Sequence, residues 1–299
     1  LLLLQKKYRG ALTAIGLGPL GAFTRIAGKI LGAAFCYTGN TLAYGQLSWA
    51  ELALYNFDRL DADTQIYALL GDPVAESLGH FFHNRAFLKN QQNAVYLKLV
   101  LPPEQISIFF TLAKQLPFAG FSITRPLKEA VLPFVKCRQK EPAINTIKRQ
   151  PDGFYGCNTD GQALIALLKR KTKILAGKKL LIIGAGGTAK ALAAAAAIEG
   201  LLLTVVNRTP AKAQALTAAL GLVNKNRTFY DFIINTTPVR NYFAAAGRYR
   251  FDIAIQGPQK TALAAWQMFV LQARLQSNFW FLEKGADRID INKKTVLAR

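Results

Sequence analysis

Lys128 lies just past the C-terminal end of a predicted strand, where a charged side chain can bind or act on a ligand. The stretch FAGFSITRPLKE, residues 118–129, begins with aromatic and β-branched residues that favour a buried strand. Pro126 ends that strand because proline has no amide hydrogen to donate. Open α/β sheets collect their ligands at this edge, although a single lysine is more often simply solvated at a helix N-terminus.

A glycine-rich turn, formed by Gly184, Ala185, Gly186 and Gly187, is the second candidate site. Glycines permit a tight turn and let backbone amides approach a pyrophosphate, which a helix N-terminus stabilises. Such turns also use glycine for steric reasons alone. Here the apolar strand LLII precedes the turn and an alanine-rich helix follows it, so the sequence predicts a dinucleotide-binding turn.

The strand LLLTVV, which follows that helix, ends in Asn207, Arg208 and Thr209. An NAD-binding fold places an acidic residue there, on the ribose hydroxyl, whereas arginine with a hydroxyl neighbour fits a 2′-phosphate. The predicted cofactor is therefore NADP. Lys212 either adds charge at the same corner or lies in solvent, and Thr237 is expected near the nicotinamide side.

These residues are positioned by two predicted α/β regions. Strands and helices alternate over residues 64–156, which is typical of βαβ units on a mostly parallel sheet. A second α/β unit opens at Gly177, with further strands at 231–238 and 251–257 and a helix over 261–281. The upstream region is expected to form a strand, a helix, a second strand and a second helix: residues 11–18, 21–32, 33–39 and from Ser48.

Composition is that of a folded globular protein with two domains, since 51% of the 299 residues are hydrophobic and 18% are charged. The net charge of +21 suits anionic ligands, nucleic acid or an anionic membrane surface. The basic residues nevertheless lie in small scattered groups, without the stripe or tail typical of nucleic-acid binding.

The sequence argues against a metalloprotein, a disulfide-stabilised protein and a membrane-spanning protein. The three cysteines, Cys36, Cys137 and Cys157, form no CxxC pair, which fits a reducing compartment and no structural zinc. Two histidines are too few for a multi-histidine metal site, and no apolar run reaches the roughly 18 residues that span a bilayer. The start, LLLLQKKYRG, has no initiator methionine, so an N-terminally incomplete chain is expected.

Taken together, several motifs resemble shikimate dehydrogenase over roughly residues 66–279. They occur in the family's order: GDPVAESLGHFFHNRAF, GFSITRPLKE, AINTI, YGCNTDG, GAGGTAKA, NRT, NTTP and MFVLQA. The upstream piece resembles the last part of a type I 3-dehydroquinate dehydratase barrel, fused as in the bifunctional proteins of plants and chlamydia-like bacteria.

The resemblance implies an α/β fold with an α/β substrate domain and an NADP-binding Rossmann domain, preceded by a partial (β/α) barrel remnant. The implied domains are residues 1–61 for the remnant and linker, 62–160 with 262–299 for the substrate domain, and 161–261 for the Rossmann domain.

The implied activity is NADP-dependent reduction of 3-dehydroshikimate to shikimate by a cytoplasmic enzyme, without nucleic-acid or membrane partners. Lys128 and Asp160 match the family's catalytic pair. A lysine ammonium can stabilise the developing alkoxide and donate the proton, while an aspartate fixes the lysine. Four further residues match the substrate-binding positions: Ser77, Thr124, Asn145 and Gln272.

Some positions depart from the family pattern. Gly79 replaces a second carboxylate-binding serine, the usual tyrosine is missing near Ile255, and Arg240-Asn241 replaces a Gly-Met pair. Segments 135–143 and 261–268 are short, and Ala265 falls where a glycine is expected.

Three alternative functions stay open: a quinate or related hydroxy-acid dehydrogenase, a catalytically degenerate NADP-binding module and, well below these, a nucleic-acid-binding protein. No dehydratase activity is expected. Arg25 and Gln46 match that enzyme's substrate contacts, but its serine is Leu42 here and its Schiff-base lysine is absent.

Overall fold

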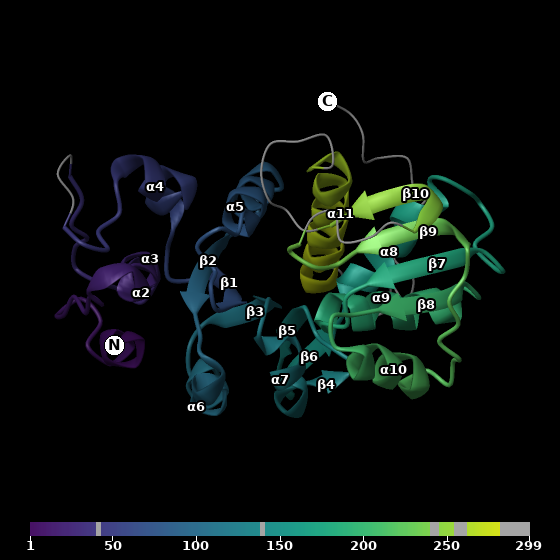
Figure 1. Ribbon diagram of the computed structural model, residues 1–299. Coiled ribbons are helices and arrows are strands. Elements are labelled where there is room, and N and C mark those ends of the chain that lie inside the picture. The colour runs from purple at the N-terminus through teal and green to yellow at the C-terminus, as the bar shows by residue number, and fades with distance from the viewer. Residues whose placement is uncertain (40–42, 138–140, 240–244, 254–261, 282–299) are drawn as a thin grey trace. The chain divides into compact units, whose positions relative to one another are not determined.

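The computed structural model describes residues 1–39, 43–137, 141–239, 245–253 and 262–281 (Figure 1). Contacts within the chain divide it into two compact units. Unit 1 comprises residues 1–138 and 145–157, and unit 2 comprises residues 139–144 and 158–299. Each unit carries its own sheet.

The first 64 residues of unit 1 are helical and irregular. Their helices are α1 (Leu2–Lys7), α2 (Gly18–Gly21), α3 (Phe23–Ile30), α4 (Trp49–Leu54) and the 3₁₀ turn η1 (Phe57–Arg59). The two helix predictions are confirmed: α3 lies within residues 21–32, and α4 follows Ser48. Ser48 and Glu51 form a capping box, in which each side chain accepts a hydrogen bond from the other residue's backbone amide.

The strands predicted at 11–18 and 33–39 are wrong, because neither segment pairs with a neighbouring strand. A strand exists only through such a ladder. Local contacts take its place: the Gly16 amide donates to Thr24 Oγ1 at 2.8 Å, and the Gly10 amide donates to the Gly32 carbonyl at 2.8 Å.

The sheet of unit 1 has six strands in the order β2-β1-β3-β5-β6-β4. Its strands are β1 (Gln65–Gly71), β2 (Ala94–Val100), β3 (Phe118–Ile123), β4 (Lys136–Cys137), β5 (Thr146–Gln150) and β6 (Gly153–Cys157). Strands β1, β2 and β3 are parallel, as predicted, whereas β5 runs antiparallel to both β3 and β6. The hairpin β5–β6 was not predicted.

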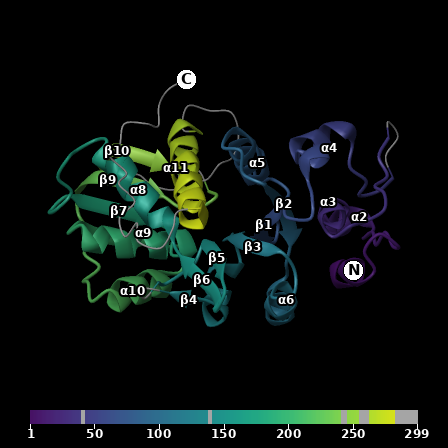
Figure 2. The same cartoon turned by 180° about the vertical axis from the view of Figure 1, so that it is seen from behind.

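Helices cover both faces of the parallel part of this sheet. The helices of this region are α5 (Gly79–Lys89), η2 (Pro103–Gln105), α6 (Ile106–Ala113), α7 (Leu127–Ala130) and η3 (Leu132–Phe134). Helices α5 and α6 lie on opposite sides of the sheet (Figures 1 and 2). Phe110 and Phe121 pack edge to face beneath α6, with ring centroids 6.0 Å apart.

The fully buried side chain of Asn84 joins α5 to the edge strand β2. Its Nδ2 donates to the Tyr96 carbonyl at 3.0 Å, and the Tyr96 amide donates to its Oδ1 at 2.7 Å. The amide side chain thus imitates a neighbouring strand at an edge that has none, which is one way to close an exposed ladder.

Asn84→Ala should lower the free energy of unfolding by about 3 kcal/mol, because it leaves two buried backbone groups of Tyr96 without partners. Urea unfolding followed by circular dichroism measures this loss. Asn90→Ala is the matched control, since the exposed Asn90 only donates to its own helix at Ala86. The control should change stability by less than about 0.5 kcal/mol, and equal losses in the two variants would contradict the role given to Asn84.

Unit 2 has a four-stranded, wholly parallel sheet in the order β10-β9-β7-β8. Its elements are α8 (Thr159–Lys169), β7 (Lys179–Ile183), α9 (Gly187–Ile198), β8 (Leu202–Val206), α10 (Pro210–Ala219), β9 (Phe229–Asn235), β10 (Ala246–Asp252) and α11 (Ala262–Phe281). This confirms the predicted strand, glycine turn, helix, strand and helix order. The strand predicted at 251–257 begins earlier, at Ala246, and residues 254–257 lie outside the described residues.

Alternate residues of β7 pack on opposite faces of this sheet. Leu180 and Ile182 join the large apolar cluster shared with α8, α9 and α11, whereas Leu181 and Ile183 join a smaller one with Tyr230 and Ile233. Helix α11 packs against α8, and so the division into units groups it with this sheet. The assignment of residues 262–299 to a substrate-binding domain stays a prediction.

Candidate functional site

The loops that follow β1 and β3 meet at the C-terminal edge of the sheet in unit 1. The Thr124 amide donates to the Leu70 carbonyl at 2.9 Å, and the Asp72 amide donates to the Arg125 carbonyl at 3.1 Å. Gly71 makes this approach possible, because a Cβ at that position would lie 2.3 Å from the Thr124 methyl carbon. Thr124 and the loop that carries Ser77 therefore share one edge.

Ser77 begins the turn into α5 and is half-buried. Its Oγ accepts a hydrogen bond from the Gly79 amide at 3.2 Å, which leaves the hydroxyl hydrogen free to donate to a ligand. Little space is left beside Gly79: a Cβ there would lie 3.2 Å from the Tyr96 hydroxyl and 3.4 Å from Ser77 Oγ.

Lys128 and Asn145 lie at the same edge of unit 1. Lys128 is the second residue of α7, directly after β3, and is half-buried. Asn145 is buried, and its carbonyl accepts a hydrogen bond from the Ile123 amide at 2.8 Å. Unit 1 thus brings together the predicted residues Ser77, Thr124, Lys128 and Asn145 around the ends of β1 and β3.

Asp160 lies in the first turn of α8, in unit 2, and only 6% of its surface is exposed. Asn158 caps this helix, since its Oδ1 accepts from the Asp160 amide at 2.9 Å while its Nδ2 donates to the Ala143 carbonyl at 2.8 Å. The Thr188 hydroxyl donates to Asp160 Oδ2 at 3.4 Å. Asp160 is therefore held next to the glycine-rich turn that begins α9.

Gly161 makes this closeness possible. A Cβ at Gly161 would lie 2.6 Å from the Ala191 carbonyl oxygen, so α8 can approach α9 only with glycine at this point. Sequence reasoning missed the roles of Asn158, Gly161 and Thr188. The signal for two of them was present in NTDG, where an asparagine precedes a helix start and a glycine follows the aspartate.

The glycine-rich turn has the geometry that its sequence predicts. Gly184 has φ +113°, a conformation that side chains rarely adopt, and a Cβ there would lie 2.3 Å from Thr236 Oγ1. Gly186 is the exposed N-cap of α9, with open space where its side chain would be, and Gly187 is the first helical residue. The half-buried Ala185 packs against the large apolar cluster.

The basic corner at the end of β8 is exposed. Asn207 Nδ2 donates to the Thr209 carbonyl at 3.1 Å and so shapes the turn into α10. Arg208, Thr209 and Lys212 are exposed beside it. No carboxylate lies among residues 202–212, so the corner can accept an anionic group rather than a ribose hydroxyl pair.

Asn235 organises the turn after β9, which carries Thr237. Its Oδ1 accepts from both the amide and the hydroxyl of Thr237, at 2.9 and 2.7 Å, and its Nδ2 donates to the Val239 carbonyl. Thr236 Oγ1 donates to the Ile183 carbonyl at 2.7 Å. These bonds hold the NTTP turn beside the glycine-rich turn.

Gln272 is half-buried on α11, which packs against α8. Ala265, on the same helix, is buried. Four other positions singled out from the sequence, Leu42, Arg240, Asn241 and Ile255, lie outside the described residues.

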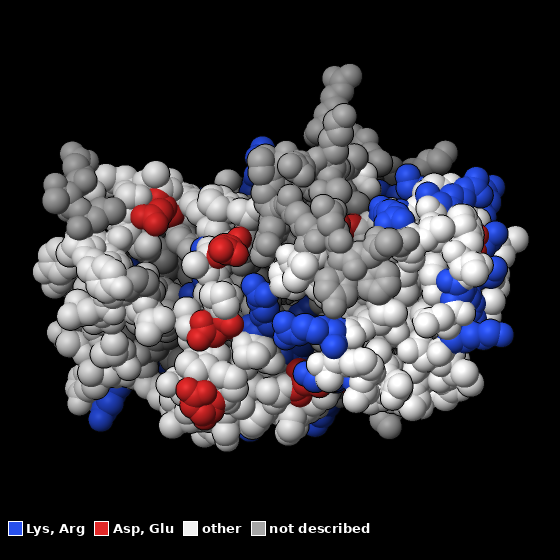
Figure 3. All heavy atoms as spheres, viewed as in Figure 1, with Lys and Arg blue, Asp and Glu red and all other residues white. Residues whose placement is uncertain are grey.

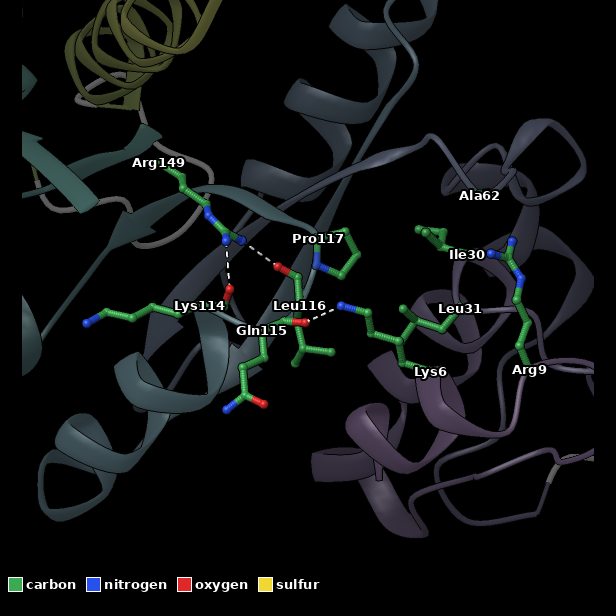
Figure 4. Close-up of a pocket in the computed structure, with 10 residues that line it drawn as sticks. All are labelled: Lys6, Arg9, Ile30, Leu31, Ala62, Lys114, Gln115, Leu116, Pro117 and Arg149. Atoms are coloured by element: carbon green, nitrogen blue, oxygen red, sulfur yellow. Dashed lines mark hydrogen bonds between the residues drawn. The ribbon is translucent and has the colours of Figure 1, made fainter. Parts of the chain in front are cut away.

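A cavity of about 280 Å³ in unit 1 does not coincide with these residues (Figure 4). It lies at the N-terminal end of β3, and three of its basic side chains are Lys6, Lys114 and Arg149. Lys6 donates to the Gln115 carbonyl, and Arg149 donates to the carbonyls of Lys114 and Leu116. Lys6 and Arg149 thus stabilise the turn at 114–117. Figure 4 shows the Lys114 side chain pointing away from both of them.

Surface charge is positive but divided. Figure 3 shows the Lys and Arg side chains of this face in several separate groups rather than in one stripe. Among the described residues, no three metal-ligating side chains come together, and none of the helices is long and apolar enough to cross a bilayer.

Two family models match the chain. Residues 69–147 match the shikimate dehydrogenase substrate binding domain, and residues 166–235 match shikimate / quinate 5-dehydrogenase. The shikimate biosynthesis protein AroDE of Chlamydia pneumoniae is 33% identical over 90% of this chain, and the chain spans 62% of that relative's length. This match leaves a tenth of the chain, about 30 residues, unmatched, and so the matched part must include some of residues 1–61.

Single-enzyme relatives and solved structures match about two thirds to three quarters of the chain. The shikimate dehydrogenase (NADP(+)) of Caldanaerobacter subterraneus is 33% identical over 68% of this chain and 82% of its own length. A crystal structure of the Thermus thermophilus enzyme in complex with NADP(H) and shikimate has a TM-score of 0.64 at 25% identity, covering 73% of this chain and 94% of that one. With its motifs in the family's order and its two α/β units matched, the chain belongs to the shikimate dehydrogenase family.

Proposed function

We propose that this chain catalyses the reversible, NADP-dependent reduction of 3-dehydroshikimate to shikimate. The observation that carries the proposal is its similarity, over most of both chains, to a relative named as an NADP(+)-dependent shikimate dehydrogenase. The resemblance of the motifs that carry Lys128, Asp160 and the glycine-rich turn to those of the family supports the proposal.

NADP fits the residues that this chain offers. Gly184 and Gly186 keep side chains away from the amides that begin α9, a helix of twelve residues whose N-terminus favours phosphate. Arg208 and Lys212 are exposed at the end of β8 and would hold a 2′-phosphate through charge-assisted hydrogen bonds. Thr237 is held by Asn235 beside the same turn.

The chemistry assigned to the chain's own residues is proton transfer and substrate orientation. Bound NADPH would supply the hydride. The Lys128 ammonium would stabilise the developing alkoxide and give it a proton, and the Asp160 carboxylate would keep that ammonium charged and in place. Ser77, Thr124, Asn145 and Gln272 would donate and accept hydrogen bonds to the carboxylate and hydroxyls of the substrate.

The test is an assay of purified protein with shikimate and NADP at mildly alkaline pH, followed by the absorbance of reduced cofactor, with quinate in parallel. Turnover of shikimate that disappears in Asp160→Asn supports the proposal. Preference for quinate would assign the alternative substrate, and NADPH binding without turnover of either acid would show a catalytically degenerate protein. Quinate carries an extra hydroxyl, and little room is left for it beside Gly79, where a Cβ would already lie 3.2 Å from the Tyr96 hydroxyl.

Arg208→Ala should weaken NADP binding about ten- to a hundredfold and leave NAD binding unchanged, because only NADP carries the 2′-phosphate. Isothermal titration calorimetry with both cofactors measures the ratio. Lys225→Ala is the control, since Lys225 is exposed in the same unit but lies outside the corner. Equal weakening for both cofactors would assign Arg208 a merely structural part.

The N-terminal residues are not proposed to be a working dehydratase. Arg25 is buried and donates to the Gly16 carbonyl at 3.0 Å, and the Gln46 side chain accepts from the Ala43 amide at 2.9 Å. Both groups are thus engaged within the segment, and we expect no turnover of 3-dehydroquinate. We also propose a cytoplasmic location, because Cys36, Cys137 and Cys157 form no disulfide, as is usual in a reducing compartment. The proposed ligands are small-molecule substrates.

A further inference from the structure

Lys98 stands on β2 beside the loop that carries Ser77. Successive residues of a strand point to opposite faces, so Tyr96 and Lys98 share the face on which α5 packs. Lys98 pairs in register with Leu69 of β1, two residues before β1 ends at Gly71. Its side chain therefore begins close to the edge where loop 72–78 leaves the sheet.

The ammonium of Lys98 contacts the backbone of loop 72–78. Its Nζ donates to the Ala75 carbonyl at 3.0 Å, which uses one of its three hydrogens. Lys98 is half-buried, and this burial lowers its pKa. Burial and the charge of Lys98 together lower the pKa of His80 to about 4, against the effect of the Ser77 backbone. Because it contacts Ala75 and affects the pKa of His80, the Lys98 ammonium lies close to the segment 75–80, which contains Ser77.

Besides Ser77 and Lys98, the neighbouring residues of α5 and β2 offer a carboxylate no other available hydroxyl or cation beside this loop. Gly79 has no side chain, and the Tyr96 hydroxyl that fills its space is hydrogen-bonded to the buried Ser122 side chain. His80 is neutral above pH 5 because its pKa is about 4, and Glu51, on α4, is the acidic group that acts on both His80 and Lys98. Lys98 is thus the cation that this side of the loop provides for a carboxylate.

We propose that Lys98 is a specificity-determining residue, whose ammonium binds the substrate carboxylate beside the Ser77 hydroxyl. The inference rests on the proposed function, since it concerns the hydroxy acid assigned to this site. Two remaining ammonium hydrogens are available for that carboxylate, where a hydroxyl at position 79 would have offered one. Recognition then depends on the charge of the ligand more than on its shape.

Kinetics with shikimate and with its uncharged methyl ester test this role in wild type, Lys98→Met and Lys98→Arg. Lys98→Met should raise KM for shikimate about tenfold, change kcat less than twofold and leave KM for the ester unchanged, because only the acid carries the charge. Lys98→Arg should restore most of the affinity for shikimate. Lys89→Met, at the exposed end of α5, is the control and should change nothing.

Calorimetric binding of shikimate separates this inference from the proposed function. A wild type that binds shikimate without turnover contradicts the proposed activity, yet a tenfold weaker Lys98→Met still supports the role of Lys98. An active wild type whose Lys98→Met variant loses acid and ester equally, or loses neither, overturns the role of Lys98 alone. A wild type that binds no shikimate overturns both.

Discussion

Lys128→Ala should lower kcat for shikimate oxidation by about 10²- to 10⁴-fold while leaving the Kd for NADPH unchanged. The reason is that the variant loses the group assigned to proton transfer, whereas the glycine-rich turn and Arg208 belong to unit 2. Initial rates measured with saturating shikimate, together with a cofactor titration, give the two quantities. Asp160→Asn should show a loss of similar size, because the amide cannot stabilise the ammonium through its charge.

Lys136→Ala is the matched control for this prediction. Lys136 belongs to the same unit and pairs with Asp152 at 2.9 Å on the exposed β5–β6 turn, away from the end of β3. Its replacement should change kcat less than twofold, since exposed ion pairs contribute little. A Lys128→Ala variant with full turnover, or a Lys136→Ala variant with the same loss, would remove Lys128 from the mechanism.

The predictions that held are those in which a residue's type decides its own local conformation. Pro126 ends β3 where the sequence places the end, and Gly184 adopts a φ that favours glycine. The motif order indicated the family because most of the short motifs mark the end of a strand or the start of a helix. Local chemistry of this kind can be read without knowing the rest of the fold.

The predictions that failed depend on partners distant in the sequence. Residues 11–18 have the composition of a strand, but a strand needs a paired neighbour and the described residues offer them none. The hairpin β5–β6 was overlooked although Pro151, Asp152 and Gly153 are a recognisable turn signal. The place of Lys98 could not be read from the sequence, since its contact with Ala75 joins residues 23 positions apart.

The glycine-rich turn provides a second large effect, on stability rather than on rate. Gly184→Ala should lower the free energy of unfolding of unit 2 by about 3 kcal/mol, because it adds an unfavourable φ to a collision with Thr236 Oγ1. In a Trp49→Phe background, urea unfolding followed by the fluorescence of Trp266 and Trp280, both on α11, reports on this unit.

Gly177→Ala separates the two causes of this loss. Gly177 also has a positive φ, +74°, but nothing lies within 4 Å of its missing Cβ, so its variant should lose only about 1 kcal/mol. Removing the colliding atom in the double variant Gly184→Ala/Thr236→Ala should recover part of the loss, since contacting residues are not additive. Strict additivity in this double-mutant cycle would show that φ alone, and not the approach of the NTTP turn, requires glycine at 184.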